Sequence, residues 1–225
     1  NSMHLSNLHA RRDEVTSPLQ KNTMTNILEK ILAQKKLEIA ALDAQALRHA
    51  AEHSPTPRDF LAAIQRRRFG THPSLIAELK LASPSKGILA PHLDLFQVAD
   101  IYAQNGASAI SVLTDEKFFM GKLETLYELR NTYHVTVPLL RKDFIIDEIQ
   151  LYEARANGAD AILLIAANLS LQQANELNDV AHQLGLETLL EVHNSKELAE
   201  FKVIRPDVIG VNNRNLKTFE VSLQT

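Results

Sequence analysis

Beyond residue 74 the chain alternates between short apolar runs and longer stretches with helical periodicity. Six apolar runs of four or five residues occur, at 75–79, 109–113, 137–140, 161–165, 188–191 and 208–211. Amphipathic stretches lie between and after them, at 94–107, 121–133, 147–159, 171–185 and 195–204. Several of these stretches end in Asn-Gly-Ala or Leu-Gly, which is a common signal of a helix C-terminus. The alternation predicts an α/β fold built on a parallel sheet.

Polar residues stand at the carboxyl end of nearly every apolar run. They are Glu78, Lys80, Thr114, Asp115, Lys142, Asp143, Glu191, Asn212 and Arg214. An open dinucleotide-binding sheet would carry Gly-x-Gly-x-x-Gly after its first strand, and the sequence has no such motif. Side chains that converge from many strand ends are typical of a closed barrel. We therefore expect a (β/α) barrel with its active site at the carboxyl ends of the strands.

The segment before the first apolar run is expected to be helical. Residues 25–53 carry apolar side chains at helical spacing, with Thr25 as the expected N-cap, and Ser-Pro-Thr-Pro ends this helix. A second helix is expected at 58–68, ending at Gly70. Residues 1–23 are polar and are interpreted as a flexible leader or a segment added for expression. The remainder, 24–225, is predicted to form one domain.

The composition excludes several classes of protein. A net charge of −3 implies no strongly basic surface for nucleic acid. The absence of cysteine excludes disulfides and thiolate chemistry and is compatible with a reducing cytoplasm. No apolar run approaches the length of a membrane-spanning helix. We therefore expect a cytoplasmic protein that binds neither nucleic acid nor membranes.

An acid and a base share one face of the first apolar run. Side chains alternate along a strand, so Glu78 and Lys80 point to one side while Ala77 and Leu79 point to the other. Burial of an ion pair adds little stability, because desolvation offsets the Coulomb attraction. The pair therefore indicates a functional interior, although polar residues at a strand end can also begin a solvated loop.

The later runs add further charged side chains by the same alternation. Lys142 shares a strand face with Leu140, whereas Arg141 lies on the other face. Glu191 aligns with Leu189, and Asn212 and Arg214 share a side with Gly210. If these sides face the barrel interior, one mouth can bind an anion, donate a proton and accept one. For each residue taken singly, a solvated loop position is the alternative.

Five segments in a fixed order resemble one enzyme family. They are IAELKLASPSKG, ISVLTDEKFFMG, VPLLRKDFIID, LLEVHN and IGVNNRNL, and the resemblance to indole-3-glycerol phosphate synthases runs from about Thr25 to the chain end. It implies a TIM barrel with an N-terminal helical extension. It also implies a cofactor-free lyase without a metal that acts on 1-(2-carboxyphenylamino)-1-deoxyribulose 5-phosphate. The implied product is indole-3-glycerol phosphate, formed with loss of carbon dioxide and water.

The resemblance also implies a role for each of four catalytic residues. Lys142 would be the general acid on the ribulose carbonyl, and Lys80 would contact the substrate anions and assist dehydration. Glu191 would be the partner acid/base, and Glu78 would position the lysines. Lysine suits the acid role because neighbouring charges tune its ammonium readily.

Four further residues would contact the substrate by the same resemblance. Asn212 and Arg214 would orient the substrate and the catalytic side chains. Phe144 would pack against the anthranilate ring, and Ser83 would assist in substrate contact.

The strand count leaves other functions open. A barrel needs eight strands and the sequence shows six, so the last two βα units, which hold the phosphate in this family, are expected to be absent from it. A catalytically inactive barrel fragment is the alternative from a different class, and a related phosphate-sugar isomerase barrel is a third. We expect a monomer if the barrel is complete. Six strands alone would leave apolar edges that favour oligomers.

Three histidines offer alternative interpretations. His49 and His53 fit the H-x-x-E-H pattern of a zinc peptidase. However, the helix ends directly afterwards, and six strands alternating with helices are not typical of such a peptidase. We therefore expect no metal there. His193 is predicted to lie off the interior line set by Glu191.

Overall fold

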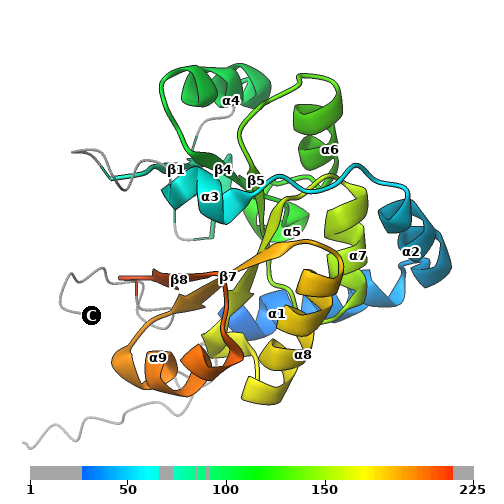
Figure 1. The fold of residues 1–225 in the computed structure, drawn as a ribbon, viewed down its shortest axis with the longest axis vertical. Helices are drawn as coiled ribbons and strands as arrows, with labels where there is room; N and C mark the ends of the chain where they lie inside the picture. Colours follow the sequence, from blue (N-terminus) through cyan, green and yellow to red (C-terminus); the bar gives the residue numbers. More distant parts are fainter. Residues whose placement is uncertain (1–26, 66–72, 85, 90–91, 215–225) are drawn as a thin grey trace, which may run out of the picture.

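Six parallel strands form one curved sheet in the computed structural model, which describes residues 27–65, 73–84, 86–89 and 92–214. The strands pair in the order in which they occur along the chain (Figure 1). They are β1 (Ile76–Leu79), β4 (Ala109–Leu113), β5 (Leu139–Lys142), β6 (Ala161–Ile165), β7 (Glu187–Val192) and β8 (Val208–Val211). A separate antiparallel hairpin joins β2 (Ala82–Ser83) to β3 (Gly87–Ile88). The predicted α/β class with a parallel sheet is confirmed.

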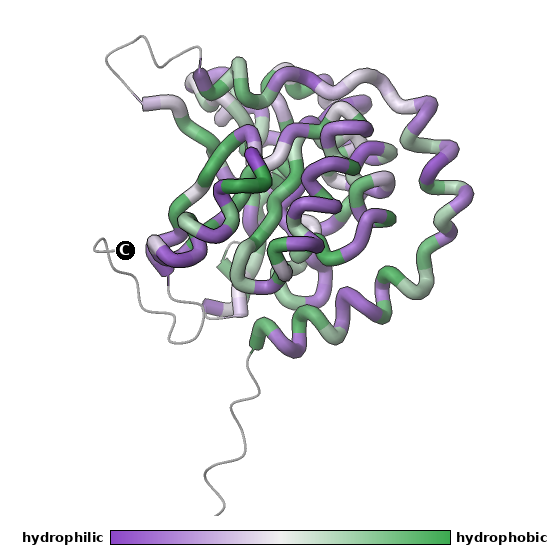
Figure 2. Tube along the Cα trace, turned by 60° about the horizontal axis from the view of Figure 1, so that its bottom comes forward, coloured by the Kyte–Doolittle hydropathy of each residue, from purple (hydrophilic) through white to green (hydrophobic). Residues whose placement is uncertain are grey.

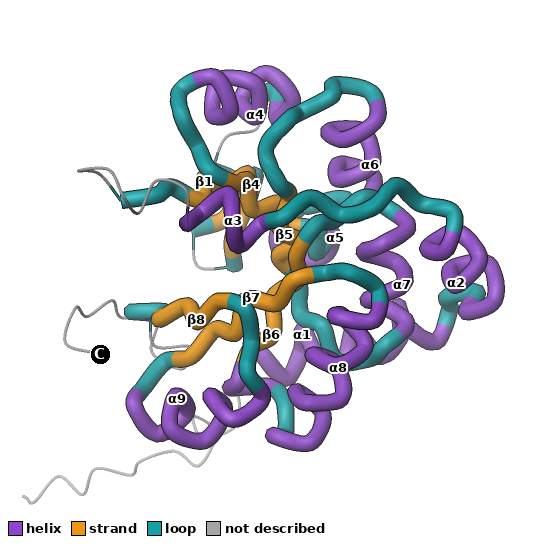
Figure 3. The backbone as a smooth tube through the Cα atoms, viewed as in Figure 1, coloured by secondary structure: helices purple, strands orange, loops and turns teal. Residues whose placement is uncertain are grey.

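Helices follow the strands and cover the outer face of the sheet (Figure 3). They are α4 (Leu95–Gln104), α5 (Glu116–Phe119), α6 (Glu124–Asn131), α7 (Ile149–Ala156), α8 (Leu171–Gln183) and α9 (Ser195–Phe201), with the 3-10 turns η3 (Ala166–Asn168) and η4 (Lys202–Ile204). Side-chain caps start four of them: Asp94 begins α4, Asp115 begins α5, Ser170 forms a capping box with Gln173 at α8, and Asn194 begins α9. Along the helices hydrophilic and hydrophobic residues alternate (Figure 2). None of the described helices is long and apolar enough to cross a membrane.

The N-terminal extension contains one more helix break than predicted. In place of one helix over 25–53 the structure has α1 (Ile27–Ala40) and α2 (Ala44–Glu52). The side chain of Asp43 accepts a hydrogen bond from the backbone N–H of Ala46 at 3.0 Å and so starts a new helix. The predicted helix at 58–68 is α3 (Phe60–Gln65). Thr25 and the predicted end at Gly70 lie outside the described residues.

Three strands have the predicted bounds, and β5 is shifted by two residues. The apolar run predicted a strand at 137–140, but β5 begins at Leu139, because Pro138 has no N–H to donate to the neighbouring strand. It continues to Lys142 because Arg141 and Lys142 pair with Val112 and Leu113 of β4, and the Arg141 side chain, only 4% exposed, is buried among hydrogen-bonding partners. The hairpin and α5 were not predicted, since each is too short to show a period.

The hydrophobic core has two parts, one on each face of the sheet. The larger part lies between the sheet and its helices and includes Val112, Leu139 and Leu164. The smaller part fills the inside of the curved sheet, where Phe60 of α3, which is 0% exposed, packs on Ala109, Leu140 and Ala161. Helix α3 therefore closes the amino-terminal end of the strands, and the carboxyl ends stay accessible.

A buried carboxylate joins three segments at the amino-terminal end of β6. Asp160 is 0% exposed, and its Oδ1 accepts hydrogen bonds from the Arg58 backbone at 2.6 Å and from Arg130 at 2.5 Å. Its Oδ2 accepts from Arg58 Nε at 3.0 Å and from the backbone N–H of Leu139 at 2.8 Å. Asp160 therefore ties the segment before α3 and helix α6 to the sheet.

Asp160→Asn is expected to lower the free energy of unfolding by roughly 1.5–3 kcal/mol. The asparagine NH2 group replaces one acceptor oxygen and then faces the N–H groups that donate to Asp160, with no acceptor for its own protons. Urea denaturation measures the change. Asp59→Asn is the matched control: Asp59 is exposed and caps α3 through the backbone N–H of Ala62, a role that asparagine also fills, so we expect a change within about 0.5 kcal/mol. Equal losses in the two variants would contradict the assigned role of Asp160.

Candidate active site

A cavity of about 540 Å³ lies at the carboxyl ends of the strands. All eight residues selected from the sequence line it: Glu78, Lys80, Ser83, Lys142, Phe144, Glu191, Asn212 and Arg214. They come from β1, the β2–β3 hairpin, β5, β7 and β8 or the residues that follow them. The structure thus brings together side chains that are up to 136 positions apart, from 78 to 214.

Strand alternation explains how β1 contributes to the cavity. Ala77 and Leu79 are buried at 7% and 2% exposure, while Glu78 faces the cavity. Lys80 follows directly after the strand, and its Nζ forms an ion pair with Glu78. Ser83 of the hairpin is buried beside the same cavity at 7% exposure. The expected sharing of one face by Glu78 and Lys80 is confirmed.

A second cation and carboxylate pair spans the cavity from β5 to β7. Lys142 Nζ lies 3.6 Å from Glu191 Oε2, and Asn212 donates a hydrogen bond to Glu191 Oε1 at 3.0 Å. Burial raises the pKa of Glu191, but His193, Lys142 and Asn212 outweigh it and lower that pKa to about 2. Glu191 is therefore a carboxylate at neutral pH.

His193 does not line the cavity, in agreement with the prediction that it lies off the interior line. Its ring Nε2 nevertheless lies 3.3 Å from Glu191 Oε1, a contact that the sequence pattern did not predict. His193 comes directly after the end of β7, and its ring lies behind Glu191.

An aromatic wall closes one side of the cavity. The rings of Phe144 and Phe119 lie 6.2 Å apart between centroids, and Ile27, Leu28 and Ile31 of α1 add aliphatic surface. Phe119 belongs to α5 and was not selected from the sequence. The segment DEKFFMG contains it, but without the helix no signal showed which of its two phenylalanines faces inward.

Helix α5 is held by its own local chemistry. The Asp115 side chain caps it by accepting a hydrogen bond from the backbone N–H of Phe118 at 2.7 Å. The helix ends at Met120, whose φ is 56°, and Gly121 follows. A Cβ at Gly121 would lie 2.3 Å from the carbonyl oxygen of Leu113, so only glycine lets the chain return this close to β4.

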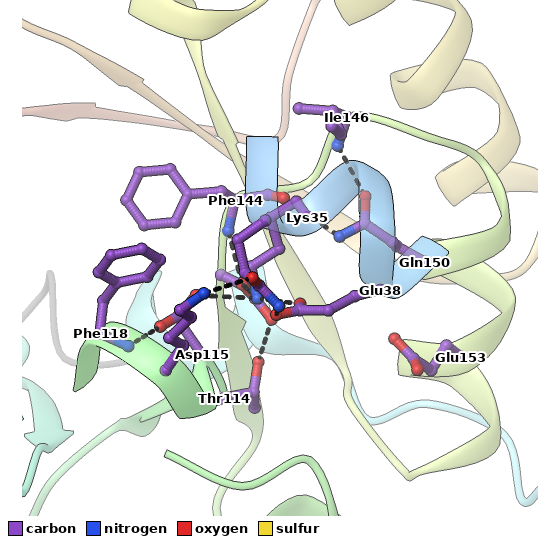
Figure 4. Close-up of polar contacts among 12 residues, drawn as sticks. Lys35, Glu38, Thr114, Asp115, Phe118, Phe144, Ile146, Gln150 and Glu153 are labelled. Atoms are coloured by element: carbon purple, nitrogen blue, oxygen red, sulfur yellow. Dashed lines mark hydrogen bonds and ion pairs between the residues drawn. The ribbon is translucent and has the colours of Figure 1, made fainter. Parts of the chain in front are cut away.

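A buried lysine fixes α1 against the strand ends (Figure 4). Lys35 is 3% exposed, and its Nζ lies 2.9 Å from carboxylate oxygens of both Asp115 and Asp143 and 2.8 Å from Glu38. Burial lowers the pKa of Lys35, but the carboxylates outweigh it and hold that pKa above its usual value. The apolar start of α1 is thereby held over the cavity.

Asp143 is the centre of this charge network. Its Oδ2 accepts hydrogen bonds from Thr114 at 2.7 Å and Arg141 at 3.1 Å, and its Oδ1 accepts from the backbone N–H of Phe144 at 2.8 Å. Burial raises its pKa, but Arg141 and Lys35 outweigh this and hold it below the usual range. Because Asp143 stands between Lys142 and Phe144 in the chain, the network fixes the backbone that carries both.

A larger cavity, of about 1090 Å³, lies between α1 and helices α4 and α6. It borders Lys35, Arg141 and Asp143, whose charges are already paired with one another and with Glu38 and Glu153. In the smaller cavity, by contrast, Lys142 Nζ lies 3.6 Å from Glu191 Oε2, and all eight residues predicted from the sequence meet there. The smaller cavity is therefore the candidate active site.

The histidine pair on α2 shows no sign of a metal centre. The rings of His49 and His53 stack at 4.2 Å, and His53 Nδ1 lies 2.7 Å from the backbone oxygen of His49. Within the ranges that the structure describes, no three His, Cys, Asp or Glu side chains are grouped so as to hold a metal ion.

Comparison with known proteins decides the family. The family model described as indole-3-glycerol phosphate synthase matches residues 28–225. The chain belongs to this family. Indole-3-glycerol phosphate synthases form TIM barrels, and six parallel strands paired in chain order are part of that architecture. The family assignment and the barrel fold predicted from the sequence are confirmed.

Individual relatives agree with the family model. The indole-3-glycerol phosphate synthase of Azoarcus sp. (strain BH72) is 48% identical over 206 residues, which cover 90% of this chain and 77% of that protein. The synthase of Neisseria meningitidis serogroup B is 47% identical over 204 residues, covering 89% and 78%. That of Albidiferax ferrireducens is 47% identical over 206 residues, covering 90% and 77%. The phosphate-sugar isomerase alternative finds no support among these relatives.

Proposed function

We propose that the cavity at the strand ends converts 1-(2-carboxyphenylamino)-1-deoxyribulose 5-phosphate into indole-3-glycerol phosphate, carbon dioxide and water. The observation that carries this proposal is the placement of Lys142 and Glu191, 3.6 Å apart, in a cavity that also holds a second lysine. Ring closure followed by dehydration needs both a proton donor and a proton acceptor, and this pair supplies them. The reaction is that of a carboxy-lyase in tryptophan biosynthesis.

Lys142 is assigned as the general acid on the substrate carbonyl. When the aromatic carbon attacks that carbonyl, negative charge develops on its oxygen, and an ammonium group beside it donates a proton. Lys142 ends β5, a strand paired on both sides, and the Asp143 network holds the adjoining backbone. The acid is therefore mounted on a rigid element, which favours precise proton transfer.

Glu191 is assigned as the proton acceptor in the dehydration step. After carbon dioxide has left, the new ring must lose a hydroxyl group and a proton to become an indole. A carboxylate with a pKa of about 2 is ionised at neutral pH and can take that proton. Asn212 holds one carboxylate oxygen at 3.0 Å and leaves Oε2 turned towards Lys142.

The remaining charged residues are assigned to binding, and Lys80 also assists dehydration by giving a proton to the hydroxyl group that leaves as water. The substrate carries a carboxylate and a phosphate, and Lys80 and Arg214 bring positive charge to the same cavity. Glu78 holds Lys80 by an ion pair and so positions it. The backbone N–H of Arg214 donates to the Asn212 side chain at 3.0 Å, which links binding to the orientation of Glu191.

The apolar residues are assigned to the aromatic part of the substrate. Phe144 and Phe119 offer ring faces at the cavity wall, and Ser83 lies at its edge for polar contact. A phosphorylated substrate of this kind is a small metabolite of the cytoplasm, where we place the enzyme, with no nucleic-acid partner. Because a complete, closed barrel has no free strand edge, we expect a monomer if the barrel is complete, whereas the six strands alone leave β1 and β8 as edges that favour oligomers.

Indole fluorescence tests the proposal. The enzyme is given the carboxyphenylamino-deoxyribulose phosphate, and we expect indole-3-glycerol phosphate and carbon dioxide to appear in equal amounts. Treatment with EDTA is expected to leave the rate unchanged, since every assigned role belongs to a side chain. Absence of the indole product would contradict the proposal, and a rate restored only by zinc would contradict the metal-free mechanism.

A further inference from the structure

A histidine stands between two carboxylates directly behind the proposed acid/base pair. His193 Nε2 lies 3.3 Å from Glu191 Oε1, and His193 Nδ1 lies 3.3 Å from Glu197 Oε2. The His193 side chain is 10% exposed, and Glu191 and Glu197 are 12% and 23% exposed. A carboxylate oxygen lies near each ring nitrogen, an arrangement that favours the doubly protonated imidazolium; the Nδ1 contact has hydrogen-bond geometry and the Nε2 contact is an ion pair by distance.

Helix α9 fixes this ring from outside the cavity. Glu197 Oε2 also accepts the backbone N–H of His193 at 2.8 Å, and its Oε1 accepts from Asn194 Nδ2 at 2.8 Å. Asn194 in turn caps the helix by accepting the backbone N–H of Glu197 at 2.9 Å. The end of β7 and the first turn of α9 thus form one hydrogen-bonded unit that holds the imidazole in place.

His193 is outside the set of residues that line the cavity, whereas Glu191 is within it. We propose that His193 is a positioning residue for Glu191: held by Glu197, its imidazolium keeps the Glu191 carboxylate ionised and turned towards Lys142. This inference rests on the acid/base role proposed for Glu191. On this proposal His193 acts through Glu191 and has no assigned contact with the substrate.

The charges around His193 determine how activity depends on pH. Glu191 and Glu197 face the ring, while Lys142 from β5 and Asn212 from the end of β8 face Glu191 from its other side. The neighbouring carboxylates hold the pKa of His193 above its usual value. The imidazolium therefore persists to a higher pH than for a free histidine, and its support of Glu191 fades as pH rises through that raised pKa.

His193→Gln tests the proposal, because glutamine can fill the space but carries no charge. We expect kcat to fall about tenfold, as for the loss of one charge-assisted contact, with KM within about twofold because the cavity wall is unchanged. Without the imidazolium the pKa of Glu191 rises, so the acid limb of the kcat profile should move to higher pH by about one unit.

Two companion variants separate positioning from a loss of folding. Glu197→Gln keeps the histidine but weakens its support, and we expect shifts in the same direction but smaller. Glu187→Gln is the control: it makes the same change at the opposite end of β7, where the carboxylate accepts the backbone N–H of Leu61 at 2.7 Å, and it should leave the acid limb in place. Thermal unfolding of each variant shows that the compared enzymes are folded.

The outcomes distinguish this inference from the proposed function. If Glu191→Gln is inactive while His193→Gln and Glu197→Gln keep the parent's kcat and acid limb, the positioning role is wrong and the acid/base role stands. If Glu191→Gln is as active as the parent, the proposed role of Glu191 fails, and the inference about His193 fails with it. A limb that moves equally in Glu187→Gln also overturns the positioning role.

Discussion

Lys142→Met is expected to lower kcat by about 10²- to 10⁴-fold, the usual contribution of a general acid. Methionine keeps the length of the side chain at the end of β5 but has no proton to donate to the substrate carbonyl. Binding is expected to change little, because Lys80 and Arg214 still supply positive charge to the cavity. Single-turnover decarboxylation, followed with the substrate bound to excess enzyme, measures the chemical step directly.

Lys117→Met is the matched control for that experiment. Lys117 is an exposed lysine on α5 whose Nζ donates to Gln34 at 2.7 Å, and it borders the larger cavity instead of the candidate active site. We expect its turnover to equal that of the parent. A decarboxylation rate of Lys142→Met within a few-fold of the parent would show that another group is the acid.

Glu191→Gln is expected to lower kcat by about 10²-fold or more, because the amide cannot accept the proton that dehydration releases. Glutamine preserves the size of the side chain and can still accept a hydrogen bond from Asn212. The loss should therefore appear in turnover far more than in thermal stability, since the residue lies at the carboxyl ends of the strands. Steady-state fluorescence assays across the pH range measure it.

The outcome is compared with Glu187→Gln, which changes the same strand at its other end. The control should keep the turnover of the parent. Turnover of Glu191→Gln that matches the parent at every pH would remove Glu191 from the mechanism.

Much of the fold could be predicted because its repeating unit is short and regular. The runs at 109–113, 161–165 and 208–211 coincide with strands because apolar residues fill them and turns bound them. The ends of β5 could not be placed the same way. Arg141 and Lys142 follow the apolar run, and they belong to β5 because they pair with Val112 and Leu113 of β4. The Arg141 side chain is then buried against Asp143, Glu153 and the backbone of Gln150.

The positions of the site residues could also be predicted, since alternation along each strand decides which side chains share a face. Glu78, Lys142 and Asn212 line one cavity as the pattern indicated. The catalytic and binding roles assigned to them remain proposals. His193 was expected to lie off this line and does not line the cavity, but its contact with Glu191 could not be predicted, because His193 lies past the end of β7.

The supporting network could not be predicted, because it joins segments far apart in the chain. Lys35 on an N-terminal helix has the sequence context of a solvated helix face. Its burial against Asp115 and Asp143 depends on how α1 lies over the strand ends, which no local pattern reveals. Phe119 was missed for a similar reason, since a four-residue helix decides its direction.

The most direct test of the account is a crystal structure of Lys142→Met with the carboxyphenylamino-deoxyribulose phosphate bound. The variant should hold the substrate without converting it. We expect the substrate in the cavity of about 540 Å³, with its aromatic ring against Phe144 and its carbonyl facing residue 142 and Glu191. Substrate bound in the larger cavity between α1 and α6, away from Glu191, would contradict the account.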